Sequence, residues 1–163
     1  MKKKKKKINK SKNKRYDKES KLWIKHRKLI YVWWYKFLQI AIQENRKVNR
    51  KFYEGWGDTS IKFDVFWKKN WKRLFGVEKE KDIPLYHIKS IALKSAPYYK
   101  RYKVYTLRKQ GLPHDKIVKE LNKNKNRVYR IGVSNDADPV AQSRKYYYEA
   151  NKTINNISKG KFP

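Results

Sequence analysis

Positive charge is the sequence feature that most restricts what this chain can form. The chain holds 45 Lys and Arg against 14 Asp and Glu in 163 residues, a formal net charge of +31. A surface this positive repels itself, so folding alone gives no reason to keep it. A polyanionic partner does, because each phosphate that is neutralised releases a condensed counterion. AT-rich codons would enrich Glu together with Lys, yet acids are scarce, so the imbalance indicates nucleic acid as the partner.

Composition also sets aside several other classes of protein. No apolar stretch approaches the roughly 20 residues that span a bilayer, and the basic N-terminus lacks the apolar core of a secretory signal. The absence of Cys excludes disulfide scaffolds and thiolate zinc sites. A hydrophobic content of 39% with 15% aromatics is too high for a wholly disordered chain. We expect a folded protein without a membrane partner, cytoplasmic and nucleoid-associated, or nuclear in a eukaryote.

Lysine dominates the first 21 residues, which we predict to be a disordered basic arm. Six consecutive lysines cannot pack against one another and stay solvated unless they meet phosphate. The arm could instead be a solubility tail, or a nuclear import signal in a eukaryotic cell. The predicted phosphate contacts of the arm are Lys2, Lys3, Lys4, Lys5, Lys6, Lys7 and Arg15.

Aromatic residues at helical spacing mark a first module, residues 22–76. Its first predicted helix runs from residue 22 to about residue 50, and its second ends at Phe75. A turn at residues 55–58 (Gly-Trp-Gly-Asp) separates the helices, with its indole packed inward. The apolar positions are Ile30, Trp33, Trp34, Phe37, Leu38, Ala41, Ile42, Phe63, Phe66, Trp67, Trp71, Leu74 and Phe75. We interpret them as core, although the lysines between them would also suit stacking on single strands.

A polar stretch, residues 77–96, is a predicted linker to a second module, residues 97–163. Pro97 can open a helix that ends at residues 110–111 (Gln-Gly), and a second helix begins near Pro113. Ile117, Val118 and Leu121 are the apolar positions of that second helix.

A third, short helix is expected to begin at Asn124 and to close at Gly132, with Val128 and Ile131 facing inward. This layout resembles the helix-turn-helix family, in the form common to resolvases, transposases and many regulators. Lys123 stands where that family usually buries a small aliphatic residue, and a proline replaces the usual hydroxyl cap. The matching steps are Gly111, Leu112, Pro113, Ile117, Val118, Leu121, Asn122, Lys123, Asn124, Arg127 and Val128.

The resemblance implies that the third helix enters the major groove of double-stranded DNA. Arg can fork onto guanine and Asn can pair with adenine, whereas Arg and Lys can equally hold phosphate without reading sequence. The implied base-reading residues are Lys125, Asn126, Arg127 and Arg130, and the further phosphate contacts are Lys123, Arg144 and Lys145. The alternative is a solvated basic face on an ordinary three-helix core.

A closing helix has the clearest local signals. Asp138 is a suitable N-cap, Pro139 suits the first helical position, and Gly160 lies just past the end. Its apolar face, which we expect to pack in the core or in a homodimer contact, comprises Val140, Tyr147, Ala150, Ile154 and Ile157. The overall layout also weakly resembles small proteins of phages and integrative elements.

Catalytic groupings are missing from the sequence. His26, His87 and His114 lie far apart without metal-ligand spacing, and there is no Gly-rich phosphate loop, so we predict no enzyme, cofactor or metal.

Taken together, the helical segments predict an all-α protein: an aromatic-rich helical N-terminal module, then a helix-turn-helix with a closing helix. Its predicted function is to bind double-stranded DNA, as a regulator or a replication or recombination accessory of a phage or mobile element. The alternatives are a structural RNA-binding component, such as a ribosomal or ribonucleoprotein subunit, and a basic virion protein that neutralises packaged nucleic acid.

Overall fold

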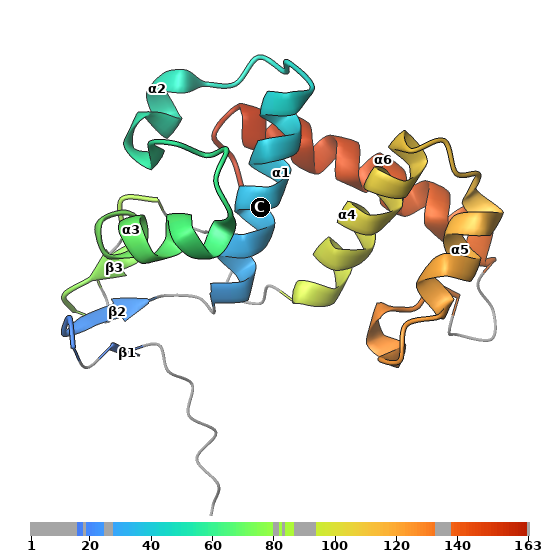
Figure 1. Ribbon diagram of the computed structural model, residues 1–163, viewed down its shortest axis with the longest axis horizontal. Helices are drawn as coiled ribbons and strands as arrows, with labels where there is room; N and C mark the ends of the chain where they lie inside the picture. Colours follow the sequence, from blue (N-terminus) through green and yellow to red (C-terminus); the bar gives the residue numbers. More distant parts are fainter. Residues whose placement is uncertain are drawn as a thin grey trace, which may run out of the picture.

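Helices make up most of the structure, a computed structural model that describes residues 16–17, 19–24, 28–79, 82, 84–86, 94–132 and 138–162. The prediction of a mainly helical protein is confirmed, with a small antiparallel sheet added at one end (Figure 1). The elements are β1 (Tyr16–Asp17), β2 (Leu22–Ile24), α1 (Lys28–Gln43), α2 (Arg50–Tyr53), η1 (Glu54–Trp56), α3 (Phe63–Phe75), β3 (Gly76–Val77), α4 (Ser95–Lys109), α5 (His114–Asn122), η2 (Arg127–Tyr129) and α6 (Pro139–Ser158), where η marks a 3-10 helix.

The sheet corrects two predictions about the N-terminal part. Residues 22–24 were expected to begin a helix, but they form the central strand β2, which pairs through Trp23 with Val77 on β3. Residues 16–17 were assigned to the disordered arm, but they pair with β2 as β1. Aromatic and β-branched residues favour a strand when a partner strand is available. For β2 that partner is β3, which is distant in the sequence, so the local pattern does not reveal it. The arm residues Lys2 to Lys7 and Arg15 lie outside the described residues.

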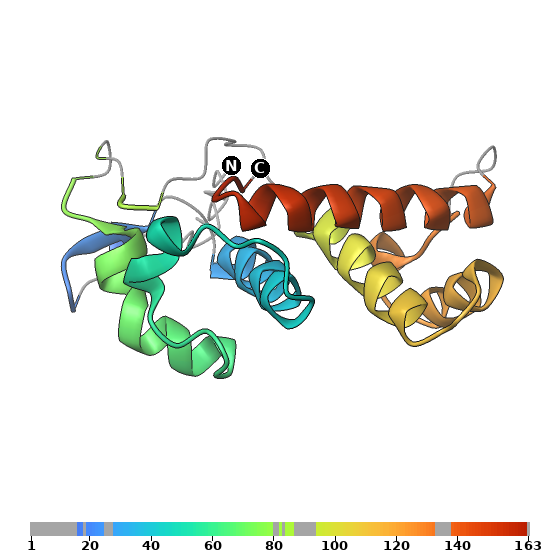
Figure 2. The same cartoon turned by 90° about the horizontal axis from the view of Figure 1, so that it is seen from above.

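Helix α1 is the central element of the molecule. It lies between α3 on one side and α4 with α6 on the other (Figures 1 and 2). A helix that is apolar around most of its circumference has to be enclosed by neighbours. Its buried residues are Ile30, Tyr31, Trp33, Trp34, Tyr35, Phe37, Leu38, Ile40 and Ala41. The interpretation of this stripe as core is confirmed except at Ile42, which is 43% exposed.

The core around α1 is built from interlocking aromatic rings. Trp34 is at its centre, with ring centroids 5.3 Å from Trp56 and 5.3 Å from Phe162. The Trp34 indole nitrogen donates to the Tyr53 hydroxyl at 3.0 Å, and that hydroxyl donates to the Ile157 carbonyl at 2.7 Å. The Trp34 indole nitrogen and the Tyr53 hydroxyl each gain a partner in this way while their rings stay buried. The predicted inward packing of the Trp56 indole is confirmed.

The same core crosses the boundary predicted between two modules. Tyr86, from the predicted linker, is buried in it and donates its hydroxyl to the Phe52 carbonyl. The C-terminal end of α6 supplies Ile154 and Ile157 to the same cluster, and Phe162 follows just after that helix. A second, smaller cluster lies between α4, α5 and the first half of α6. Helix α6, red in Figure 1, therefore connects the two clusters along its length.

Candidate nucleic-acid interface

The helical hairpin α4–α5 forms as the sequence predicts. Helix α4 ends at Lys109, and Gly111 adopts φ 89°, a left-handed conformation that favours glycine. The Leu112 amide closes this turn by donating to the Leu107 carbonyl at 3.2 Å. Pro113 takes the N-cap position of α5 in an extended conformation, without a side-chain cap. The two helices that the sequence predicts before residue 123 are therefore both present.

A small apolar cluster holds the hairpin to α6. Val104, Ile117 and Ile131 are fully buried in it or nearly so, and Leu121 completes its centre. The predicted inward positions Ile117, Leu121 and Ile131 are confirmed, and Val118 is half-buried at the edge. Because Leu121 and Ile131 are both held in this cluster, the packing positions residues 123–130 between them.

The expected third helix is not formed, which corrects the prediction at the centre of the resemblance. Residues 124–131 contain only the single 3-10 turn η2, and Val128, expected inside, is 60% exposed. Asparagine side chains take hydrogen bonds that a helix would give to its own carbonyls: Asn124 accepts from the amide of residue 126, and Asn126 from that of residue 128. Such local side-chain bonds compete with helix formation. We call residues 123–130 the tip loop.

The tip loop brings the predicted base-reading residues together. Lys125, Asn126 and Arg127 are exposed, whereas Arg130 is half-buried. The Asn126 amide oxygen caps η2, and Arg130 Nε donates to the Asn124 carbonyl at 2.7 Å. Two of the four side chains therefore support the loop itself. The other two, Lys125 and Arg127, are exposed.

Two of the three phosphate contacts predicted in this module are exposed near the start of α5. Arg144 and Lys145 lie on the first turns of α6, next to Ser143, whose hydroxyl is 2.9 Å from His114 Nδ1. Burial, then the positive charges of Arg108 and Arg144, lower the pKa of His114. The electrostatic potential here is therefore positive, as a phosphate contact requires. The third, Lys123, forms an exposed ion pair with Glu120 at 2.7 Å, which offsets its charge.

Sequence analysis missed the rest of the outward side of α6. The exposed side chains on this helix and its cap follow one stripe: Ala141, Arg144, Lys145, Tyr148, Lys152, Asn155 and Lys159. Figure 2 shows α6 lying along one side of the molecule, with α1, α4 and α5 all on its other side. The signal was present as spacing, because residues 145, 152 and 159 are lysines seven positions apart.

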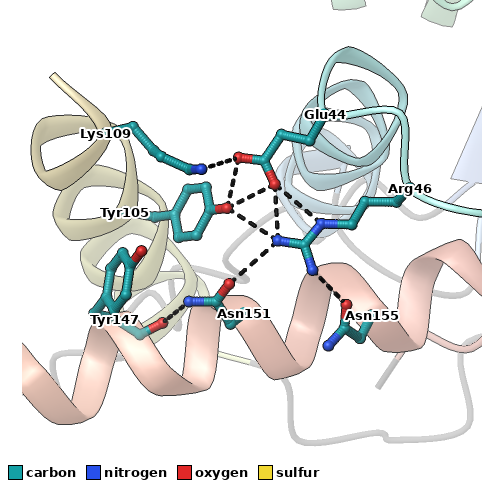
Figure 3. Close-up of polar contacts among 7 residues, drawn as sticks. All are labelled: Glu44, Arg46, Tyr105, Lys109, Tyr147, Asn151 and Asn155. Carbon is teal, nitrogen blue, oxygen red and sulfur yellow. Dashed lines mark hydrogen bonds and ion pairs between the residues drawn. The ribbon is translucent and has the colours of Figure 1, made fainter.

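A polar network joins the end of α1 to α4 and α6 (Figure 3). The Glu44 carboxylate accepts from the Tyr105 hydroxyl at 2.6 Å and pairs with Arg46 at 2.8 Å and Lys109 at 3.0 Å. Arg46 also donates to Asn155 at 2.7 Å. Burial acts to raise the pKa of Glu44, but these hydrogen bonds outweigh it and hold the pKa below its ordinary value. The network is fully paired, so its role is to fix the helices rather than to react.

Other kinds of site have little support in the described part of the chain. A pocket of about 640 Å³ lies between the end of α1 and residues 45–59, and its lining mixes apolar side chains with Lys47, Arg50 and Glu54. Among the described residues, no three His, Asp or Glu side chains gather as metal ligands. None of the helices described has the length and apolar character needed to cross a bilayer. The comparisons found no match to the chain among protein-family models, curated proteins or solved structures.

Proposed function

We propose that the protein binds nucleic acid mainly through phosphate contacts, with double-stranded DNA as its target. We place it among the regulators and the replication or recombination accessories of phages and mobile elements. The observation that carries the proposal is how the charges are distributed. Most of the described acids are engaged within the molecule, whereas Lys and Arg are exposed along the tip loop and the outward side of α6.

Intramolecular contacts account for most of the described acids. Glu44, Asp64, Glu120 and Glu149 each pair with a Lys or Arg. Asp138 caps α6 by accepting from the backbone amide of residue 140 at 2.8 Å. Even with every acid counted, the chain keeps a formal net charge of +31, so the cations greatly outnumber the acids that could offset their field. The surplus charge is therefore presented to solvent, where it can meet a polyanion.

The tip loop is the part of the helix-turn-helix-like unit that would approach the duplex. Lys125 and Arg127 would contact the DNA, with Asn126 and Arg130 holding the loop in shape. Arg144 and Lys145 would hold a neighbouring phosphate. A single 3-10 turn offers fewer side chains to base edges than a recognition helix does. We therefore infer that phosphate contacts dominate and that discrimination among duplex sequences is weak.

A titration tests this proposal. The full chain would be titrated with a labelled duplex, a single strand and a structured RNA at two salt concentrations. We expect binding to the duplex at physiological ionic strength, with an affinity that falls steeply as salt rises. A protein that ignored all duplexes under these conditions would refute the proposal, and stronger retention on structured RNA would replace DNA by RNA.

A variant pair assigns the contact to the tip loop. Lys125→Ala with Arg127→Ala should weaken duplex binding and reduce the slope of log K against log salt by up to about 1.8, since each phosphate contact contributes about 0.9. Lys68→Ala with Lys69→Ala removes the same charge from the exposed side of α3 and serves as the control. Equal effects of the two double variants would show that only net charge matters, and would remove the tip loop from the interface.

A further inference from the structure

We propose that the outward side of α6 is a second nucleic-acid-binding surface, one that binds single strands by stacking an unpaired base on Tyr148. It comprises Arg144, Lys145, Tyr148, Lys152, Asn155 and Lys159 and is called the α6 stripe below. This goes beyond the proposed function, because it adds a different ligand and does not depend on the tip loop. The stripe shares Arg144 and Lys145 with the proposed duplex contacts, whereas Tyr148, Lys152 and Lys159 lie outside them.

Packing does not explain the exposure of the Tyr148 ring. Three tyrosines stand in a row at residues 146–148. The Tyr146 ring receives the Lys100 ammonium at 5.7 Å, and the Tyr147 ring stacks on Tyr105 at 5.3 Å. The third, Tyr148, is 70% exposed, and its ring makes no aromatic or cation contact with the described residues. A ring presented to water in this way is available to stack on a ligand.

Cations surround this ring in a regular pattern. Arg144 and Lys145 precede Tyr148 by four and three residues, and Lys152 follows it by four, so all three side chains neighbour the ring on the helix surface. Lys145, Lys152 and Lys159 are each separated by two helical turns, about 10.5 Å. A backbone that runs along α6 would therefore meet a positive charge at each end of a stacked base. A basic track with an interleaved aromatic ring is how proteins hold single strands without reading sequence.

No exposed position within α6 itself is an acid, unlike on α3 and α5, and the exposed acid at its N-cap, Asp138, accepts from the backbone amide of residue 140 at 2.8 Å. The outward side of α5 carries Asp115 and Glu120 beside its lysines, and that of α3 carries Asp64. The acid within α6 is Glu149, which is half-buried and pairs with Arg101 on α4 at 2.8 Å. An ordinary solvated helix face mixes both signs of charge. A helix face on which the exposed charged side chains are cations is complementary in charge to a polyanion.

Single strands are favoured over duplexes here because of Tyr148. In a duplex the bases are stacked inside, so an exposed ring on a straight helix could offer only its hydroxyl to a phosphate. An unpaired base can lie on the ring face, which contributes enough for its loss to weaken binding about 5- to 150-fold per base. The lysines alone would serve either ligand, so Tyr148 decides between them.

Binding of the full chain to a labelled oligothymidylate and to a duplex of equal length tests the proposal. Tyr148→Ala should weaken oligothymidylate binding at least about fivefold and leave duplex binding nearly unchanged. Tyr148→Phe keeps the ring and should bind like the parent. Because Tyr148 is exposed and unpacked, both variants should fold, which circular dichroism checks.

Charge variants test the lysines of the α6 stripe separately from Tyr148. Lys145→Gln with Lys152→Gln should reduce the salt slope for oligothymidylate by up to about 1.4, since each contact to a single strand contributes about 0.7. Lys68→Gln with Lys69→Gln on α3 is the charge-matched control and should change it less. Unchanged oligothymidylate affinity in Tyr148→Ala, or an equal loss on the duplex, would overturn the single-strand proposal. Failure of the tip-loop variants would leave it standing, because they are read on the duplex.

Discussion

Glu44 shows how one residue can hold three helices in place. Its carboxylate comes from the end of α1 and meets Tyr105 and Lys109 of α4, while its partner Arg46 bonds Asn151 and Asn155 of α6. Burial of the carboxylate is unfavourable by itself, but each of its hydrogen bonds is charge-assisted and therefore stronger than a neutral one. Sequence analysis missed this node, because nothing in the local pattern links residue 44 to residues 60 or 100 positions away.

Replacing Glu44 by Gln should destabilise the protein by about 1–3 kcal/mol, because the partly buried Arg46 and the exposed Lys109 both lose their counter-charge. Urea denaturation would measure the change. Glu120→Gln is the matched control: its pair with Lys123 is exposed, so we expect a change of under about 1 kcal/mol. Equal destabilisation by the two variants would contradict the role given to Glu44.

The Glu44 network also predicts a pH dependence. Folding lowers the pKa of Glu44 below its ordinary value of 4.5, so the unfolded chain binds more protons at this site in mildly acidic solution. Its contribution to stability is therefore complete above pH 4.5 and is lost as the pH falls through the lower folded value. Unfolding free energies measured from neutral pH downward should decline less steeply in Glu44→Gln than in the parent protein. Parallel curves would show that the site is uncoupled from folding.

Capping and turn signals predicted the hairpin α4–α5 and the start of α6. Gly111 ends the first helix of the hairpin, and Asp138 with Pro139 begins α6 at the expected residue. The strands and the tip loop were not predictable in this way. Pairing of β2 with β3 depends on residues some 50 positions apart, and periodicity carries no such information. In the tip loop the apolar spacing matched a helix, but asparagines at residues 122, 124 and 126 bind the backbone instead.

Loss of the α6 cap should be measurable. Asp138→Ala removes the acceptor for the amide of residue 140 and should destabilise the protein by about 1 kcal/mol. Asp138→Ser supplies another good capping side chain and should restore most of that stability. Thermal unfolding followed by circular dichroism distinguishes the two. If serine were no better than alanine, the effect would come from charge rather than from capping.

Across the whole molecule, α6 joins two apolar clusters, and we expect them to unfold as one cooperative unit. Its first half packs on α4 and α5, and its second half supplies Ile154 and Ile157 to the aromatic core around α1. The sequence suggested two modules because the charged and Pro-containing stretch between them looks like a linker. It could not reveal that Tyr86 in that stretch, and Phe162 beyond α6, return to the first core.

All six tryptophans lie between residues 23 and 71, so Trp fluorescence reports on unfolding of the aromatic core around α1. It can therefore test whether the two clusters unfold together. Leu121→Ala creates a cavity in the smaller cluster, remote from every Trp, and should destabilise the protein by about 2–5 kcal/mol. Urea unfolding midpoints from Trp fluorescence and from circular dichroism should fall together. A fluorescence midpoint that stayed at the parent value would show instead that the two clusters unfold independently.

The stacking of Phe162 against Trp34 also has a consequence for biosynthesis. The ring that closes one side of the first core belongs to residue 162, so α1 and α3 cannot be fully enclosed while the ribosome is still adding the preceding residues. Until then the Trp34 ring lacks the Phe162 ring that stacks on it in the folded protein. The newly made protein therefore completes its fold after translation has passed this residue, in an environment crowded with ribosomal RNA.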